Sequence, residues 1–439
     1  MKSSLPKVLH PVGGKAMLAR VLETARALEP AAIHVVYNPG APEVRTTLDA
    51  PGITWVAQHE RLGTGHAVQQ AMPGVPEDAE VLVLYGDIPL VQPATLAPML
   101  ERPEALTVLT MDLAEPSGYG RILRDVKGRV VGIVEERDAD SDQRSINEVN
   151  SGIIFARAGS LKGWLSRLGT GNSQGEYYLT DVFAMAADEA CEIGSIGAPS
   201  GRELQGANDQ SQLAQLETAC RAMTAERLMQ KGVRIMDPER VELRGDIEAS
   251  PEVVIEVGAI LEGRNRLGEG VHVGPGCVLK DCDLGAGTRI HAYSVLEGVR
   301  TQGDCDIGPF ARLRPGTELD AGCKVGNFVE IKQTRLGEGS KASHLSYLGD
   351  AKIGAGVNIG AGTITCNYDG ANKHQTVIAD GVFIGSDTQL VAPVSIGRNA
   401  VIGAGSTITR DTPEDQLTLS RSKQVSVPGW RRPQKGEKK

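Results

Sequence analysis

Aliphatic residues recur at every sixth position over residues 253–408. One run consists of Ile384, Leu390, Ile396, Ile402 and Ile408. A period of six fits neither the 3.6-residue period of a helix nor the two-residue alternation of one long strand. It fits short strands that turn a corner after every six residues, with the aliphatic side chain inside and Gly at many corners. Three such sides make one coil of a parallel β-helix, which this stretch predicts.

The first 208 residues show a different pattern, in which helical and strand-like segments alternate. The continuous apolar run 81–85 predicts a strand that is buried on both faces of a parallel sheet. Alternation of this kind predicts an open α/β sheet of the doubly wound type. Helices are predicted at 15–28, 65–72 and 176–189, and further strands at 33–37, 106–111 and 152–155.

A single long helix is predicted at residues 209–231, because apolar residues recur there near helical spacing and Gly232 follows as a stop. The chain therefore divides into three expected segments. Residues 1–208 form the α/β domain, residues 209–250 form a linker helix and connection, and residues 251–439 form the β-helix with a C-terminal tail.

Composition narrows the possible functions of the 439-residue chain. Its formal net charge of -9 disfavours a protein that coats nucleic acid. No apolar run of about 18 residues is present, so no membrane span is expected, and the N-terminus lacks an apolar signal core. The seven cysteines are scattered without a Cys-x-x-Cys pair, which favours a reducing cytoplasm over a disulfide framework.

Two segments of the first domain carry candidate chemistry. Asp87 follows the strand 81–85, where ligands bind in open α/β sheets. Its carboxylate is a possible Mg²⁺ ligand, and the alternative is a cap for the turn before Pro89. Residues 63–66 open a helix whose free N–H groups are suited to a base or a phosphate, and the alternative is a simple capping turn.

The six-residue rhythm breaks twice in the second half. Ile359 and Ile384 are 25 residues apart rather than 24, and the polar segment 367–373 between them predicts a loop that leaves the coil. Between Ile331 and Ile353 the spacing is 22. That piece contains His344 among cations, which is either a surface histidine or a general base close to a bound phosphate.

Several motifs of the first domain occur in the order in which they occur in nucleotide-sugar pyrophosphorylases. Together with the hexapeptide array, they make nearly the whole chain resemble the bacterial bifunctional N-acetylglucosamine-1-phosphate uridyltransferase/glucosamine-1-phosphate acetyltransferase family. The motifs are Leu5-Pro6-Lys7-Val8-Leu9, Gln58 with Leu62-Gly63-Thr64-Gly65-His66, Tyr85-Gly86-Asp87, Gly118-Tyr119-Gly120-Arg121-Ile122, Val134-Glu135 and Asn150-Ser151-Gly152.

The resemblance implies a Rossmann-like nucleotidyltransferase domain, truncated at its N-terminus, followed by a left-handed parallel β-helix. It also implies uridyl transfer from UTP to N-acetylglucosamine-1-phosphate with Mg²⁺. Lys7 would neutralise phosphate, and the Tyr85-Gly86-Asp87 segment would contact the substrates. The uracil would lie against Gln58, Gly63 and Thr64, the sugar against Gly120, Glu135 and Asn150, and Mg²⁺ against Asp87 and Asn208.

For the second half, the resemblance implies that His344 takes a proton from the amine of glucosamine-1-phosphate, which then attacks the thioester of acetyl-CoA. It also implies a cytoplasmic homotrimer. The sugar phosphate would be bound by Arg314, Lys332, Tyr347 and Asn358, and CoA by Ala361, Asn367, Tyr368, Ser386, Ala404 and Arg421. The basic tail, residues 431–439, is either a solvated end or a cover for the CoA phosphates of a neighbour.

The chain departs from the family pattern at its start. The family opens with an apolar strand and a Leu-x-x-Gly-x-Gly-Thr-x-Met loop before Leu-Pro-Lys, whereas this sequence begins just before Leu5-Pro6-Lys7. We therefore expect a start upstream of Met1 or a fragment, with little or no uridyltransferase activity in the chain as written. Alternatives are an acetyltransferase alone, a pyrophosphorylase for another sugar, and a hexapeptide scaffold or regulatory protein.

Overall fold

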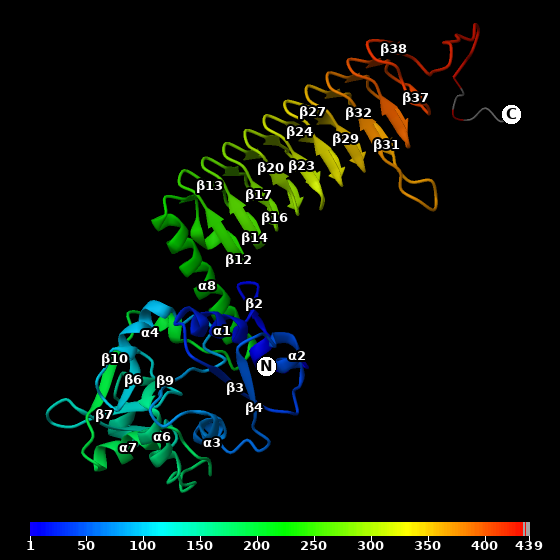
Figure 1. Cartoon of the computed structure of the whole chain (residues 1–439). Helices are drawn as coiled ribbons and strands as arrows, with labels where there is room; N and C mark the ends of the chain where they lie inside the picture. The colour runs from blue at the N-terminus through cyan, green and yellow to red at the C-terminus, as the bar shows by residue number, and fades with distance from the viewer. Residues whose placement is uncertain (433–434, 436–439) are drawn as a thin grey trace. The chain divides into compact units, whose positions relative to one another are not determined.

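The computed structural model describes residues 1–432 and residue 435. The chain forms two compact units, Met1–Ala222 and Met223–Lys439, and helix α8 (Gln210–Gln230) crosses their boundary (Figure 1). The role expected for the basic tail concerns residues that lie mostly outside this description. Among the described residues, no helix combines the length and the apolar character that crossing a bilayer requires.

The first unit is built on a mixed sheet with helices on both faces. Successive residues of β6 point to opposite sides, so Val108 packs in a cluster with Trp164 and Phe183, and Leu109 packs in another with Leu96 and Met99. The strand order is β10 (Ile193–Gly197), β6 (Leu106–Asp112), β9 (Glu148–Arg157), β7 (Arg121–Arg124) and β8 (Val130–Val134). The helices are α1 (Met17–Ala27), α2 (Glu43–Leu48), α3 (Thr64–Ala71), α4 (Pro93–Leu100), α5 (Ser141–Arg144), α6 (Ala158–Leu165) and α7 (Asp181–Asp188).

The prediction of a fully buried parallel strand at 81–85 is wrong. Strand β5 (Glu80–Val83) pairs antiparallel with β9, and its residues are half-buried or exposed. The nearby β3 (Ile33–Tyr37) and β4 (Ile53–Ala57) pair in parallel but form a separate sheet. The apolar run therefore lies beside one strand only, because its pairings in the described structure are those to β9.

The predicted helix at 176–189 begins later than expected, at Asp181. Tyr177 is held in an extended connection instead, because its N–H donates to Leu62 O at 2.8 Å and its carbonyl accepts from the N–H of Gly65 at 2.8 Å. These long-range hydrogen bonds fix residues that local helical pattern alone favours for a helix.

The second unit is the left-handed parallel β-helix that the sequence predicted (Figure 1). Its inward-facing aliphatic side chains form one continuous core, and Leu261, Ile331, Ile384 and Leu390 are each 0% exposed. Each such side chain stabilises the array by about 1.5–3 kcal/mol. One ladder contains β11 (Arg234–Ile235), β13 (Val254–Ile255), β15 (His272–Val273), β18 (Arg289–Ile290), β21 (Asp306–Ile307), β24 (Lys324–Asn327), β27 (Lys341–His344), β30 (Asn358–Ile359), β33 (Phe383–Ile384), β36 (Val401–Ile402) and β38 (Leu417–Thr418).

The other two faces share a second, longer ladder, which starts at β12 (Glu242–Ala249) and β14 (Ile260–Leu267). Where these faces pass the candidate site, the strands are β25 (Glu330–Lys332), β26 (Thr334–Leu336), β28 (Tyr347–Gly349), β29 (Ala351–Ile353), β31 (Ile364–Cys366), β32 (Thr376–Ile378), β34 (Gln389–Val391) and β35 (Val394–Ile396).

The register explains both breaks in the rhythm. Ile331 pairs with Leu348, and Leu336 with Ile353, so the 22-residue spacing arises from a coil of 17 residues and contains no inserted loop. Asn358 pairs with Phe383, which makes the next coil 25 residues long. Its extra residues leave the coil between β31 and β32, as predicted, and form a hairpin with a bridge from Tyr368 to Lys373.

Candidate active sites

The first candidate site gathers residues from three distant parts of the first unit. The Lys7 ammonium lies 2.5 Å from Asp87 Oδ2 and 2.6 Å from Asn208 Oδ1. Gly86 beside Asp87 allows a close approach, since a Cβ there would lie 3.3 Å from Leu18. The structure therefore brings together the predicted phosphate cation and both predicted metal ligands.

The donor set at this point fits Mg²⁺. A carboxylate oxygen of Asp87 and an amide oxygen of Asn208 converge on one nitrogen, and Mg²⁺ is commonly held by one or two protein oxygens together with substrate phosphates. Within the described part of the chain, no group of three or more His, Cys, Asp or Glu could hold a metal ion. A cation here would therefore depend on Asp87, Asn208 and the substrate.

The predicted sugar residues also lie together. The Asn150 N–H donates to Gly120 O at 2.8 Å, and a Cβ on Gly120 would lie 3.4 Å from Glu135 Oε2. Tyr85 links this group to the Lys7 site: burial raises the pKa of its phenol to about 12, with the charges of Glu135 and Asp87 acting in the same direction.

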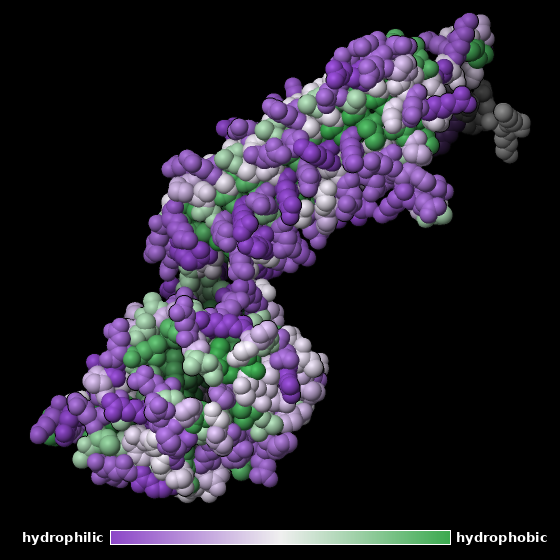
Figure 2. Space-filling view, in the orientation of Figure 1, coloured by the Kyte–Doolittle hydropathy of each residue, from purple (hydrophilic) through white to green (hydrophobic). Residues whose placement is uncertain are grey.

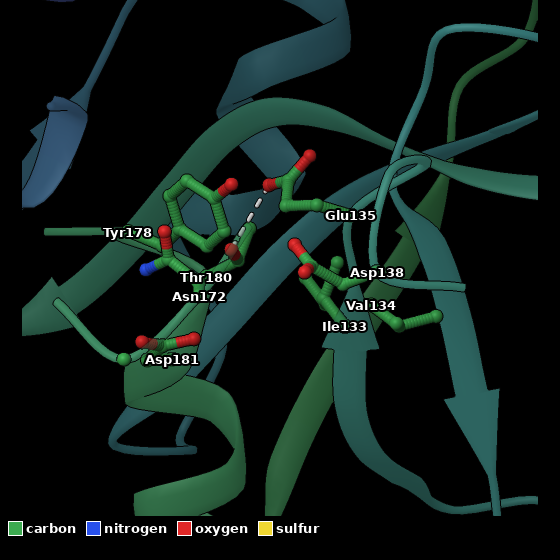
Figure 3. Close-up of a pocket in the computed structure, with 9 residues that line it drawn as sticks. Ile133, Val134, Glu135, Asp138, Asn172, Tyr178, Thr180 and Asp181 are labelled. Carbon is green, nitrogen blue, oxygen red and sulfur yellow. Dashed lines mark hydrogen bonds between the residues drawn. The ribbon is translucent and has the colours of Figure 1, made fainter. Parts of the chain in front are cut away.

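Beside Glu135 is a cavity of about 200 Å³ (Figure 3). Thr180 Oγ1 donates to Glu135 Oε1 at 3.0 Å, and the Tyr178 ring forms part of the wall. Burial raises the pKa of Glu135, the charges of Asp181 and Asp138 add to that shift, and the Thr180 hydrogen bond opposes it. Sequence analysis found only Glu135 here, because the other polar lining residues lie in a connection without a recognisable motif.

The predicted uracil residues surround the start of α3. Gly63 precedes the helix with φ of +109°, a conformation that favours glycine, and the Gln58 amide lies 3.0 Å from His66 Nδ1. The expectation that the helix start offers only free N–H groups is wrong for Gly65, whose N–H donates to Tyr177 O at 2.8 Å. Thr64 Oγ1 accepts from the Leu179 N–H at 3.2 Å.

The second candidate site centres on His344, at a corner of the β-helix. Asn327 lies beside it in the preceding coil, and its Oδ1 is 2.8 Å from His344 Nδ1. Because an amide oxygen only accepts hydrogen bonds, Nδ1 carries the proton, and the lone pair of Nε2 is left free. Sequence analysis missed Asn327, which can be found by counting back one 17-residue coil.

Cations lie at the far end of the face that follows this corner. Lys332 is paired with Gly349 in the ladder, Arg314 Nη1 donates to Glu330 Oε1 at 2.9 Å, and the ammonium of Lys373 beside Lys332 lowers the pKa of Lys332. Sequence analysis did not single out Lys373, which the hairpin brings here.

Tyr347 lies on the face between these cations and His344. Its phenol oxygen is 3.4 Å from Asn367 Nδ2, and the Asn367 amide also donates to Asp350. Asn358 lies elsewhere: it pairs with Lys341 on the face that ends at His344. The described chain therefore does not gather all four predicted sugar-phosphate residues on one face.

The predicted CoA residues form a column along the β-helix. The register Ala342↔Ile359↔Ile384↔Ile402 places His344, Ala361, Ser386 and Ala404 each two residues further on, one in each successive coil. Arg421 extends this column, since its Nη1 donates to Ala404 O at 2.9 Å. Small side chains above His344 leave a shallow track for an elongated molecule. Tyr368, 61% exposed, lies apart from the column in the hairpin.

Comparison with known proteins agrees with this division. The family of MobA-like NTP transferase domains matches residues 1–140, and the bacterial transferase hexapeptide family (six repeats) matches residues 375–410.

Full-length relatives carry both parts. The chain is 55% identical to the bifunctional protein GlmU of Alkalilimnicola ehrlichii, over 99% of this chain and 94% of that protein. It is 53% identical to the proteins of the same name from Marinobacter nauticus and Stenotrophomonas maltophilia, over 99% of this chain and 96% of each. The chain therefore belongs to the GlmU family of bifunctional proteins, the uridyltransferase/acetyltransferase family that its sequence resembles.

Proposed function

We propose that the β-helix unit transfers an acetyl group from acetyl-CoA to the amine of glucosamine-1-phosphate. The first unit then joins the resulting N-acetylglucosamine-1-phosphate to UTP, giving UDP-N-acetylglucosamine and pyrophosphate. The observation that carries this proposal is the alignment of His344 with a track of small residues on one side and cations on the other. Family membership favours two activities over an acetyltransferase alone or an inert scaffold.

In the acetyl transfer, His344 Nε2 removes a proton from the sugar amine while the nitrogen attacks the thioester carbonyl. The new C–N bond forms, the C–S bond breaks, and the CoA thiolate leaves and takes up a proton. Asn327 holds the imidazole in the tautomer that leaves Nε2 free. Lys332, Lys373 and Arg314 suit the sugar phosphate, because cations attract its negative charge.

In the uridyl transfer, the phosphate oxygen of the sugar attacks the α-phosphorus of UTP, and pyrophosphate leaves. This reaction needs positioning and charge neutralisation more than covalent assistance. Lys7 supplies a positive charge, and the Gly120–Asn150 segment with Glu135 orients the sugar. Mg²⁺ held by Asp87 and Asn208 would neutralise phosphate charge when bound.

We also propose that the chain acts as a homotrimer. Two observations support association. The residues proposed for the sugar phosphate divide over two faces of one chain, and an apolar strip lies uncovered on a corner of the β-helix. In that strip the ring of Phe310 stacks on those of Tyr293 and Phe328 at 5.6 and 5.5 Å, although these side chains are 48–60% exposed. Burial of such a strip favours association.

The variant His344→Ala tests the acetyl transfer. If His344 is the general base, this change lowers kcat for formation of N-acetylglucosamine-1-phosphate by about 10²–10⁴-fold. Uridyl transfer by the same preparation, measured as UDP-N-acetylglucosamine formation, should stay within about twofold of the parent and serves as the control for folding. A loss of acetyl transfer below about threefold would exclude His344 as the base.

A further inference from the structure

The hairpin that leaves the long coil is closed by an ion pair. His374 Nε2 lies 2.7 Å from Asp369 Oδ2, while Asp369 Oδ1 accepts from the N–H groups of Ala371 at 2.8 Å and Asn372 at 2.7 Å. A second contact joins the two arms, because the His374 N–H donates to Asn367 O at 2.8 Å. In Figures 1 and 2 this hairpin projects beside β31 as a hydrophilic arm.

Asp369 is the centre of this closure. The N–H of Asn372, followed by the contact with His374, holds its pKa well below the usual range, so its carboxylate remains charged throughout the neutral pH range. Its side chain is 45% exposed and that of His374 is 32% exposed. Neither residue therefore belongs to the core of the coils, and both act on the shape of the hairpin.

The closure lies directly next to proposed substrate groups. Lys373 precedes His374 in the chain, bridges to Tyr368, and places its ammonium beside that of Lys332. Two neighbouring ammonium groups repel each other, so a restraint on the backbone of Lys373 is needed to keep them together in the absence of an anion. The contacts of His374 provide that restraint one residue away.

We propose that the His374–Asp369 pair is a positioning device that holds Lys373 beside Lys332, and that it thereby sets the affinity for the phosphate of glucosamine-1-phosphate. This inference rests on the proposed acetyl transfer. His374 touches no reacting atom in it, so the pair should act on binding of the sugar phosphate and leave the proton transfer at His344 unchanged.

The first test compares His374→Leu with His374→Gln in the full-length protein. H374L should raise KM for glucosamine-1-phosphate by about three- to fivefold, the upper range for an exposed ion pair. Its kcat should stay within about twofold. H374Q keeps an N–H donor near the position of Nε2 and should stay within about twofold in KM. Far-UV circular dichroism should be unchanged in both variants, because the coils are untouched.

A matched control removes a similar pair elsewhere on the β-helix. His291 Nε2 contacts Asp306 with both side chains about as exposed, at 47% and 45%. This pair lies three coils before His344, since His291 is followed in the register by Gly308, Gly326 and Ser343. His291→Leu should leave both KM and kcat within about twofold of the parent.

The second test asks whether His374 acts through Lys373. In a Lys373→Met background, the addition of H374L should change KM for glucosamine-1-phosphate by less than about 1.5-fold, because the group being positioned is gone. An unchanged KM in H374L, a failure of H374Q to restore it, or full additivity with K373M would overturn this proposal while leaving acetyl transfer standing. A parent protein that forms no N-acetylglucosamine-1-phosphate would overturn the proposed function as well.

Discussion

Two glutamates of the first unit show how environment sets opposite behaviour in the same side chain. Glu135 lies at the cavity, where burial raises its pKa. Glu148 forms a two-pronged ion pair with Arg124, with Arg124 Nε 2.7 Å from Oε2 and Nη2 2.6 Å from Oε1, and this hydrogen bonding lowers its pKa. Protonation therefore stabilises the folded protein at Glu135 and destabilises it at Glu148.

For Glu135, the raised pKa means that the native state loses stability as pH rises from about 4 through the folded-state pKa. Glu135→Gln removes this loss. In urea unfolding of the full chain, the stability of E135Q relative to the parent should therefore increase between pH 4 and pH 8. A relative stability that is constant or falls with pH would contradict the assignment, whatever the effect of E135Q on activity.

Glu148→Gln is the control of opposite sign. The lowered pKa of Glu148 contributes stability that is present above about pH 4 and is lost as pH falls through the folded-state pKa. E148Q should therefore cost about 0.5–1 kcal/mol at pH 7, and this cost should shrink toward zero near pH 3. The same urea measurement checks both variants.

Much of the acetyl-transfer site could be predicted residue by residue, because motifs mark it. His344 stands in a broken repeat among cations, and the family resemblance assigns its neighbours. Asn327 and Lys373 were missed for different physical reasons. Asn327 is adjacent only through the 17-residue coil, and Lys373 reaches Lys332 only because the hairpin folds back. Thr180 lies 45 residues from its partner Glu135, and no local pattern joins them.

At the scale of elements, the β-helix was predictable because each side of each coil repeats the same local requirement. Strand β34 shows the rule within three residues: Leu390 points inward and is 0% exposed, while its neighbour Val391 is 36% exposed. The first unit was less predictable, since strand β5 and the start of α7 are fixed by partners far away in the sequence.

Strand β34 provides a direct test of this inward rule. Leu390→Ala should lower the free energy of unfolding of the β-helix unit by about 2–5 kcal/mol, because it removes buried methyl groups and leaves a cavity. Val391→Ala, one residue away on the outer side, should cost less than about 1 kcal/mol. Denaturant unfolding of both variants checks the prediction, and equal costs would contradict the assigned faces.

At the scale of the whole molecule, each compact unit holds its own candidate site. Lys7, Asp87 and Asn208 belong to the first unit, and His344 belongs to the second. The residues of one site make no contribution to the core of the other unit. The two reactions should therefore be separable by single substitutions in the intact chain.

Asp87→Asn tests that separation. The substitution removes one charged oxygen from the proposed Mg²⁺ position and should lower uridyl transfer by about 10²-fold or more. Acetyl transfer by the same preparation should remain within about twofold of the parent, the mirror image of the result expected for His344→Ala. A parallel loss of both activities in D87N would show that the units depend on each other.

The column from His344 to Ala404 has a consequence for how such a protein can change over time. Each coil adds one position to the track and advances it by about 4.8 Å, the spacing between neighbouring strands. Insertion or deletion of part of a coil would turn every later inward residue toward solvent, so only whole coils can be gained or lost. The β-helix thus acts as a ruler with fixed graduations, and finer adjustment of its reach is left to side-chain size at Ala361, Ser386 and Ala404.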